Sequence, residues 1–329
     1  MRRRAAEAWL YAGRIDHGLE LFDRIVGTTG LRPSSNRYIA LTQTLWARFR
    51  LRLRGFTSQP RPVSEIPAHQ IELLKTLRAM TIAYFPLDVI VGGNDPCPLA
   101  RAALNAGHVE DATLALAMEG CIASTKSSRA GRDRAVEALI QFPAVANWAP
   151  EGVWRLCIDT MWSGLNEGSQ IGEARSLRLL QVAEANGVPP TYRSLMYYTI
   201  AFCLVRTLSY ARHEPRIRFV QRREEEAGPF GEVRGRAFDS YYHLLRGDPE
   251  LALERSGKDV WEKAFKRPTM LRAAARKSEA WVRLYMADPD GALEVALDAL
   301  RIMLPIGDPP PRRGSTAAIW SDAEHSPAP

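Results

Sequence analysis

The chain lacks any apolar run long enough to cross a membrane. Its 329 residues contain no uninterrupted apolar stretch of the ~18 residues that a spanning helix requires. Residues 1–14 carry arginines but no apolar segment behind them, which weighs against a secretory signal. We therefore expect a cytoplasmic protein that does not enter a membrane.

Cysteine and histidine are too few and too widely spaced to suggest a metal site. There is no Cys-x-x-Cys pair, and no two of the six histidines stand four residues apart. In a chain without an export signal, cysteines are most simply buried and reduced. These cysteines are Cys97, Cys121, Cys157 and Cys203. The sequence predicts neither zinc nor any other cofactor.

Signatures of nucleotide chemistry are also missing. The chain has no kinase glycine-rich loop, catalytic loop or Asp-Phe-Gly motif. Gly257 and Lys258 lack both the earlier glycine and the following Ser or Thr of a P-loop. We predict that the chain is not an enzyme. The alternative is an enzyme with an unrecognised site in a helical fold, because catalytic groups assemble in space rather than in sequence.

Lysine is scarce, so arginine supplies almost all of the positive charge. Six of the 44 basic residues are lysine, and the net charge is +7. An arginine bias of this kind often reflects genome composition, which weighs against a dedicated nucleic-acid surface. Such a surface would use residues 48–54 and 212–223. An arginine-rich nucleic-acid-binding helical protein is kept as an alternative.

A short sequence pattern occurs twice near the C-terminus. Residues 244–254 read LLRGDPELALE and residues 284–294 read LYMADPDGALE. Asp248 and Pro249 thus recur forty residues later as Asp288 and Pro289. The same pattern places two small residues five positions apart at Gly13 and Gly18 and at Gly107 and Ala112, and a weaker copy occurs at Ser169 and Ala174.

Each copy predicts two helices joined by a tight turn. The first small residue ends one helix in the left-handed conformation, and the aspartate accepts free N–H groups at the start of an amphipathic second helix. The second small residue lets the two helices press together, so Ala252 and Ala292 should be buried. Loss of Asp248 or Asp288 should cost less than enlarging these alanines, through capping alone.

Helix pairs of this kind resemble the tetratricopeptide unit, although its standard period is 34 residues. We predict an all-α chain, specifically a degenerate tetratricopeptide-like α-solenoid of stacked antiparallel helix pairs over residues 1–305. A generic helical bundle is the alternative, but five copies of one turn exceed what a bundle requires. Residues 306–329 are rich in proline and small polar residues, which predicts a disordered tail.

Two further segments have clear helical signals. The arginines of LWARFRLRLRG alternate with apolar residues, but the segment continues a helical run from about Tyr38, so we expect a helix that ends at Gly55. The next helix should start near Pro67. Residues 194–208 are apolar on almost every side, which predicts a helix surrounded by neighbours.

The order of several segments resembles one protein family. These segments are AEAWLYAGRIDHGLELFDRI, LWARFRLRLRG, NAGHVEDATLALAME and YYHLLRGDPELALE. They are similar to the C-terminal helical-repeat region of large bacterial serine/threonine protein kinases, in which the kinase domain is followed by an AAA-type ATPase module. The resemblance implies a non-catalytic interaction or regulatory scaffold of a signalling protein.

Aromatic residues are candidates for a binding surface on such a scaffold. A solenoid exposes side chains of its first helices along the inner curve. The candidates are Trp9, Tyr241, His243, Trp281 and Tyr285. We expect a protein or peptide to occupy this concave groove, with a kinase or ATPase domain as one candidate partner. At least half of these aromatic residues should belong to the core instead.

Overall fold

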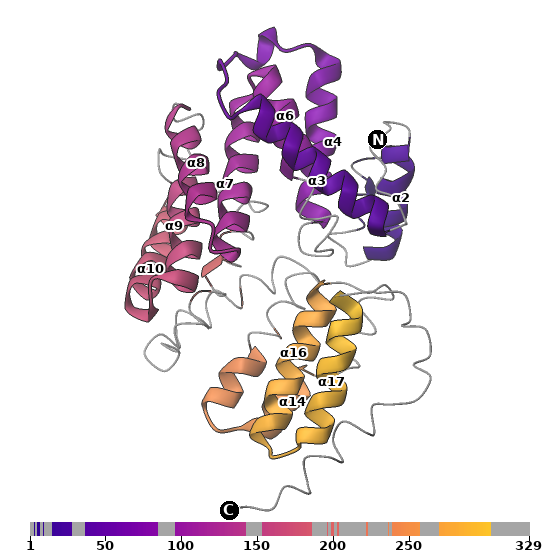
Figure 1. The fold of residues 1–329 in the computed structure, drawn as a ribbon, viewed down its shortest axis with the longest axis vertical. Coiled ribbons are helices and arrows are strands. Elements are labelled where there is room, and N and C mark those ends of the chain that lie inside the picture. The colour runs from indigo at the N-terminus through magenta and orange to yellow at the C-terminus, as the bar shows by residue number, and fades with distance from the viewer. Residues whose placement is uncertain are drawn as a thin grey trace, which may run out of the picture.

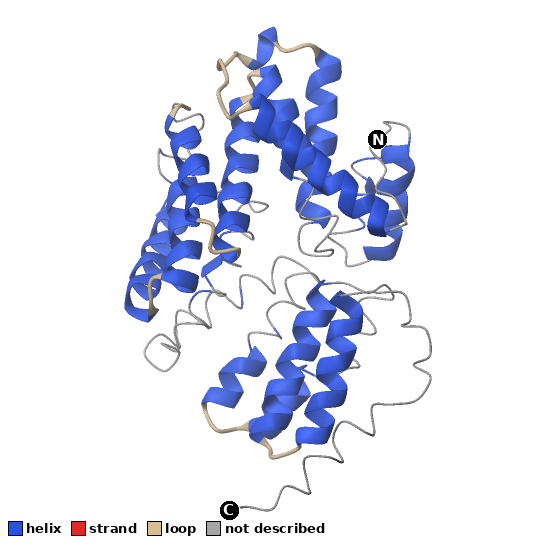
Figure 2. Cartoon of the chain, in the orientation of Figure 1, coloured by secondary structure: helices blue, strands red, loops and turns tan. Residues whose placement is uncertain are grey.

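The computed structural model confirms an all-α chain in the residues that it describes (Figures 1 and 2). These are residues 15–27, 37–84, 96–142, 153–185, 239–256 and 270–303, with the separate positions Arg3, Ala5, Ala6, Trp9, Met196, Thr199, Ile200, Cys203, Arg222 and Arg236. No strand occurs in this part of the chain. None of its helices combines the length and the apolar character needed to span a membrane.

The first group of helices comes from the N-terminal half. Its elements are α2 (Ile15–Gly27), α3 (Arg37–Arg54), the 3-10 turn η1 (Val63–Glu65), α4 (Ala68–Tyr84), α6 (Pro96–Ala106), α7 (Val109–Thr125), α8 (Arg129–Ile140), α9 (Val153–Asn166) and α10 (Ser169–Ala185). Both α3 and α4 pack on α6, which pairs with α7. Helices α7 to α10 lie side by side (Figure 1).

The second group lies at the C-terminal end of the described chain. Residues 239–245 are helical and lead into α14 (Pro249–Ser256). Helix α16 (Met270–Tyr285) and helix α17 (Pro289–Met303) form the tightest pair in this group, and α14 packs on α16 (Figure 1).

Both ends of the segment around α3 match the predictions. Gly55 has φ of 74° and donates its N–H to the Leu51 carbonyl at 3.0 Å, so the helix ends there. The Pro67 carbonyl accepts the N–H groups of Gln70 and Ile71, which starts α4 at the expected place. The segment is therefore a helix, although the alternation of arginine with apolar residues is typical of a strand.

The core is centred on α7, which neighbouring helices cover on most sides. Its buried residues include Leu114, Leu116 and Met118. Met196, Ile200 and Cys203 are also fully buried, as predicted for the apolar segment 194–208, whose remaining residues are outside the described set apart from Thr199. The predicted tail at 306–329 lies outside the described residues.

In the described part of the chain, four turns between helices share one backbone geometry. A residue with positive φ follows the first helix, and the next residue donates its N–H to the carbonyl five positions earlier, at 2.9–3.0 Å. This is the Schellman ending of a helix. The residues with positive φ are Gly107 (73°), Ser127 (52°), Gly247 (77°) and Ala287 (58°).

The residue after each positive φ caps the following helix. Its carbonyl accepts the N–H group four residues later, and its side chain accepts the N–H group three residues later. The four caps and their side-chain acceptor distances are His108 (3.4 Å), Ser128 (3.3 Å), Asp248 (3.1 Å) and Asp288 (2.9 Å). Both aspartates therefore cap the helices that follow them, as predicted.

The small residue four positions after the cap packs against the preceding helix. Ala252 is 0% exposed and Ala292 is 3% exposed, which confirms the prediction for both copies. Ala112 occupies the same position after His108 and is also fully buried. Gly18 is buried within α2, whereas Gly13 lies outside the described residues.

The predicted pairing of Ser169 with Ala174 is wrong. The positive φ of 103° lies at Gly168, whose carbonyl accepts the Gly172 N–H at 3.2 Å. Gly172 is buried and Ala174 is exposed. Because a glycine itself caps α10, the packing position lies two residues earlier than the sequence pattern indicated.

The turn from α7 to α8 was missed altogether. Arg132 stands where three of the turns have a buried alanine, so the spacing of small residues gives no signal there. The long side chain is accommodated because its guanidinium leaves the crossing and pairs with Asp159 of α9 at 2.7 Å.

Ala252→Leu and Ala292→Leu should each lower the free energy of unfolding by about 1–3 kcal/mol, because a larger side chain overpacks the crossing. Ala174→Leu is the matched control on an exposed helix position, and it should change stability by less than about 0.5 kcal/mol. Urea unfolding measures all three. A silent Ala292→Leu, or an equal cost at Ala174, would contradict the packing role.

Asp288 does more than cap α17. Its Oδ2 accepts a hydrogen bond from Arg283 at 2.9 Å, and Arg283 also donates to Glu279, which is 5% exposed. Glu279 pairs with Arg276 at 2.7 Å, and Arg276 reaches Asp298 of α17 at 2.9 Å. The prediction that Asp288 acts through capping alone is therefore wrong, since it terminates a chain of ion pairs between α16 and α17.

We expect Asp248→Ala to lower the free energy of unfolding by about 1 kcal/mol, as the loss of a helix cap does. Asp288→Ala should have a larger effect than Asp248→Ala, because it removes the ion pair with Arg283 as well as the cap. The N–H of Gly291 and the guanidinium of Arg283 lower the pKa of Asp288. Because the pKa of Asp288 is lower in the folded chain than its unfolded value of about 3.9, the ionised carboxylate stabilises the fold above that pH. This stabilisation is lost as the pH falls further. The stability difference between wild type and Asp288→Ala should shrink from pH 6 to pH 3, as measured by thermal unfolding. A difference that is constant with pH would exclude an ionised Asp288 as its source.

Candidate functional site

Trp281 and Tyr285 are the two predicted binding residues that the structure brings onto one surface. They stand four residues apart on α16 and are 52% and 61% exposed. Leu284 beside them is also exposed, and so are Leu293 and Leu297 of α17. This end of the chain therefore presents apolar side chains to solvent from both helices.

The other predicted binding residues lie in different elements. Trp9 is exposed and meets the ring of His17 edge-on, with centroids 6.0 Å apart. Tyr241 and His243 are half-buried in the helical segment 239–245, where the His243 Nε2 lies 3.6 Å from a carboxylate oxygen of Asp239. None of the five candidates is buried in the core, so the expectation that at least half of them belong there is wrong; the core position in this segment is taken by Tyr242, which is 2% exposed.

A broader apolar surface lies on α3, which sequence reasoning missed. Leu45, Trp46, Phe49 and Leu53 fall on one side of this helix and are 58%, 58%, 48% and 70% exposed. The rings of Trp46 and Phe49 stack at 5.5 Å. We call these four residues the α3 face. Their helical spacing was visible in the sequence, but the sequence did not show that α3 packs through Leu51 instead.

The arginines of α3 divide between internal contacts and the surface. Arg48 donates to Glu119 of α7 at 3.2 Å, and Arg54 donates to Asn105 of α6 at 2.7 Å. Arg50 and Arg52 lie exposed between them. Two of the four arginines thus attach α3 to its neighbours rather than forming a free basic surface.

A pocket of about 260 Å³ lies between α3, α7 and the start of α8. Its walls combine apolar and basic side chains with one carboxylate and one thiol. The lining residues are Leu45, Arg48, Leu51, Arg52, Phe56, Cys97, Glu119, Ile122, Ala123, Lys126, Ser128, Gly131 and Arg134. The two kinds of wall suit a ligand with both a charged and an apolar part.

Glu119 is the one carboxylate of the pocket, and it already has two partners. It accepts from Arg48 at 3.2 Å and from the Cys97 thiol at 3.2 Å. Burial and the neighbouring carboxylate raise the pKa of Cys97 far above its ordinary value, so the thiol stays protonated. Neither group is a free base, and the pocket offers no acid–base pair.

Lys126 stands at the end of α7 among other cations. Burial lowers the pKa of its ammonium, and the charges of Arg48 and Arg52 lower it further, against a smaller opposite effect of the Glu119 carboxylate. Within the described residues, no ion pair joins Lys126 or Arg52 to a carboxylate. This electrostatic crowding is relieved when an anion enters.

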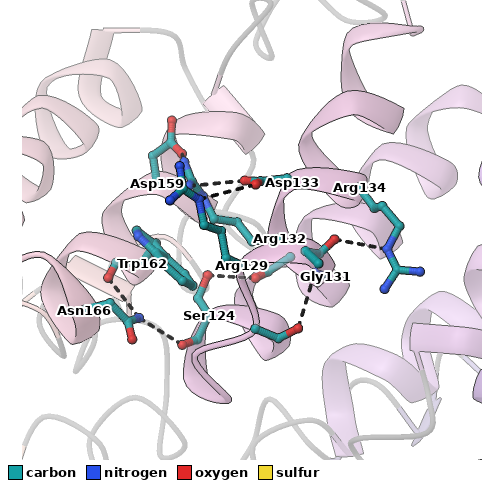
Figure 3. Close-up of polar contacts among 12 residues, drawn as sticks. Ser124, Arg129, Gly131, Arg132, Asp133, Arg134, Asp159, Trp162 and Asn166 are labelled. Atoms are coloured by element: carbon teal, nitrogen blue, oxygen red, sulfur yellow. Dashed lines mark hydrogen bonds and ion pairs between the residues drawn. The ribbon is translucent and has the colours of Figure 1, made fainter.

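The orientation of α8 decides which of its side chains reach the pocket. Figure 3 shows Arg132 directed to Asp159 of α9, with its guanidinium 5.2 Å from the centre of the Trp162 ring, while Arg134 points to the opposite side. Asn166 of α9 also donates to the Ser124 carbonyl at 3.2 Å. These contacts fix the start of α8 against α9, so that Gly131 and Arg134 line the pocket.

Burial of the cysteines, which the sequence predicts, is confirmed for three of the four. All four are free thiols; Cys97, Cys157 and Cys203 are buried, and Cys121 is half-buried. Burial raises the pKa of Cys157 to about 12. No cluster of His, Cys, Asp and Glu suited to a metal ion occurs among the described residues.

The raised thiol pKa makes alkaline stability a test of this burial. Cys157 ionises near pH 9 in the unfolded chain but near pH 12 in the folded chain, so it stabilises the fold below pH 9 and loses that contribution as the pH rises. The free energy of unfolding should decline above pH 9, and Cys157→Ala should make the decline shallower by up to ~1.4 kcal/mol per pH unit. Equal slopes for both proteins would argue against a buried thiol.

Comparisons with known proteins find no counterpart of this arrangement. No family model matches the chain, and no curated protein or solved structure does so either.

Proposed function

We propose that this chain is a non-catalytic scaffold that binds a partner protein through the α3 face. The observation that carries the proposal is the side-by-side exposure of Leu45, Trp46, Phe49 and Leu53. Soluble monomers rarely expose a contiguous apolar patch of this kind unless it binds something. Tryptophan, phenylalanine and arginine are also enriched in the centres of protein interfaces.

The charge around the α3 face favours an acidic partner segment. Residues 37–54 contain no aspartate or glutamate, whereas Arg50 and Arg52 flank the apolar side chains. An amphipathic helix with leucines on one side and glutamates beside them would cover the apolar stripe and pair with these arginines. We therefore expect such a helix as the occupant.

The arrangement of the helix pairs supports a tetratricopeptide-like solenoid as the scaffold. Helix α7 packs on α8 and α9 packs on α10, as two successive pairs would, and α7 also packs on α9 between these pairs. Contacts between neighbouring units are what a stack of repeats requires. The recurrence of one turn geometry from Gly107 to Ala287 adds to this support.

Within this proposal, the chain serves as the interaction region of a kinase–ATPase signalling protein of the type that its sequence resembles. A kinase or ATPase domain is then one candidate for the partner. The exposed Trp281 and Tyr285 of α16 would provide a second contact surface for the same assembly.

The nucleic-acid alternative loses support from the contacts of α3. Binding along a nucleic-acid backbone needs a row of free cations, but Arg48 is engaged with Glu119 and Arg54 with Asn105, which leaves only Arg50 and Arg52 of the arginines at 48–54. The second predicted segment, 212–223, lies outside the described residues apart from Arg222. An enzyme site is not favoured either, because Glu119 is paired and the Cys97 thiol is held protonated.

Photo-crosslinking in cells that make the protein tests the α3 face directly. Phe49→p-benzoylphenylalanine places the reactive group on the face, and the same substitution at the exposed Arg129 of α8 is the control. We expect a protein adduct at position 49 but not at position 129, with the adduct in an acidic helical segment. Adducts with lipid or nucleic acid at position 49, or the same adducts at both positions, would overturn the proposal.

Once the partner is identified, affinity measurements give the second test. Trp46→Ser and Phe49→Ser should each weaken binding at least about tenfold, as expected for central aromatic residues. Ile140→Ser is the matched control, because it removes an apolar side chain of similar exposure from α8, outside both proposed contact surfaces. If Trp281→Ser weakens binding and the two α3 variants do not, the docking surface lies on α16.

A further inference from the structure

We propose that the pocket between α3, α7 and α8 binds a small organic dianion, namely a phosphate monoester that carries an aromatic or other apolar group. This site adjoins the α3 face at Leu45, which belongs to both, but the aromatic part of that face is distinct from it, because Trp46 and Phe49 do not line the pocket. The proposal rests on the balance of charges in the pocket, on its apolar wall and on its size.

The charges in the pocket do not cancel. Arg48 and Glu119 form an ion pair at 3.2 Å, so together they contribute no net charge. Arg52, Lys126 and Arg134 remain, each from a different segment: α3, the end of α7 and α8. Arg134 donates from its Nε to the Ala130 carbonyl, and none of the three side chains pairs with a carboxylate among the described residues. The site therefore holds three surplus positive charges.

The start of α8 adds to the positive field. Ser128 and Gly131 form part of the wall, and the first turn of α8 contains no acidic residue. The partial positive charge of a helix N-terminus is commonly balanced by an acidic side chain. Here the acidic side chains that reach this turn, Asp133 and Asp159, are paired with Arg129 and Arg132, so an anion in the pocket would supply the balance for the helix N-terminus.

The rest of the wall is apolar. Leu51, Phe56 and Ile122 also line the pocket, so a purely ionic ligand would not use the whole site. A cavity of about 260 Å³ has room for a phosphate group joined to one ring, but not for a long polymer. Inorganic phosphate would leave this wall in contact with water, so the apolar part of the ligand should add affinity.

A dianion fits the surplus charge better than a monoanion does. A phosphate monoester carries close to two negative charges above its second pKa near 6 and offers three acceptor oxygens. Arginine and lysine donors bind such oxygens through charge-assisted hydrogen bonds. A single carboxylate would leave most of the surplus charge uncompensated.

Isothermal titration of the full chain with phenyl phosphate is the direct experiment. We expect saturable one-site binding that weakens when the NaCl concentration is raised and when the pH is lowered through about 6, because the ester then loses its second charge. Phenyl sulfate, a monoanion with the same ring, and inorganic phosphate, which has no ring, should both bind several-fold more weakly. No saturable binding of phenyl phosphate would overturn the proposal.

Charge-removing variants locate the ligand. Arg52→Gln and Lys126→Gln should each weaken phenyl phosphate about tenfold or more. Arg50→Gln is the matched control, since it removes the same charge from α3 at a position that does not line the pocket. Phe49→Ser should also leave the affinity unchanged, which separates this site from the α3 face. An equal loss in Arg50→Gln would show binding by overall charge alone and would overturn the site.

A variant that gains affinity excludes simple damage to the fold. Glu119→Gln keeps the shape of the side chain but removes the one negative charge that lines the pocket. Phenyl phosphate should then bind several-fold more tightly. Circular dichroism melts confirm that each variant is folded at the titration temperature. Unchanged or weaker binding by a folded Glu119→Gln protein would contradict the charge balance on which the proposal depends.

Discussion

The close crossing of two helices at a tight turn is the constraint on which the described structure depends. A residue with positive φ ends the first helix, its neighbour caps the second, and the side chain four residues after the cap must fit between them. Gly247, Asp248 and Ala252 meet these three demands in one copy. The same geometry at Ser127 and Ser128 directs α8, and this is what brings Arg134 to the pocket wall.

Features encoded within a few residues could be predicted from the sequence, whereas features that depend on distant residues could not. The caps at Asp248 and Asp288 and the end of α3 at Gly55 are local, so their signals lie in adjacent residues. The ion pair between Arg276 and Asp298 joins two helices, and no spacing rule indicates it. The turn at Ser127 could not be predicted for a related reason: Arg132 replaces the small residue of the pattern, and it fits there because its guanidinium pairs with Asp159 of α9.

The candidate site shows the same limit more strongly. Its residues come from positions 45 to 134, and their charges act together because α3 packs on α6 and its Arg48 reaches Glu119 of α7. The sequence shows that α3 is rich in arginine, but packing decides that Arg48 is neutralised by Glu119 and that Arg52 is not. In the same way, the burial of Leu51 determines that Trp46 faces solvent.

The turn also explains why the pattern lacks a regular period. Its requirements are confined to six consecutive positions, from the residue with positive φ to the small residue at the crossing. Insertions and deletions in the segments between pairs leave those positions untouched, so the length of the interval does not affect the helix crossing. A lineage with such an architecture can drift to an interval of forty residues, as between Asp248 and Asp288, while each helix crossing is inherited intact. Divergence of this kind erases periodicity before it erases structure.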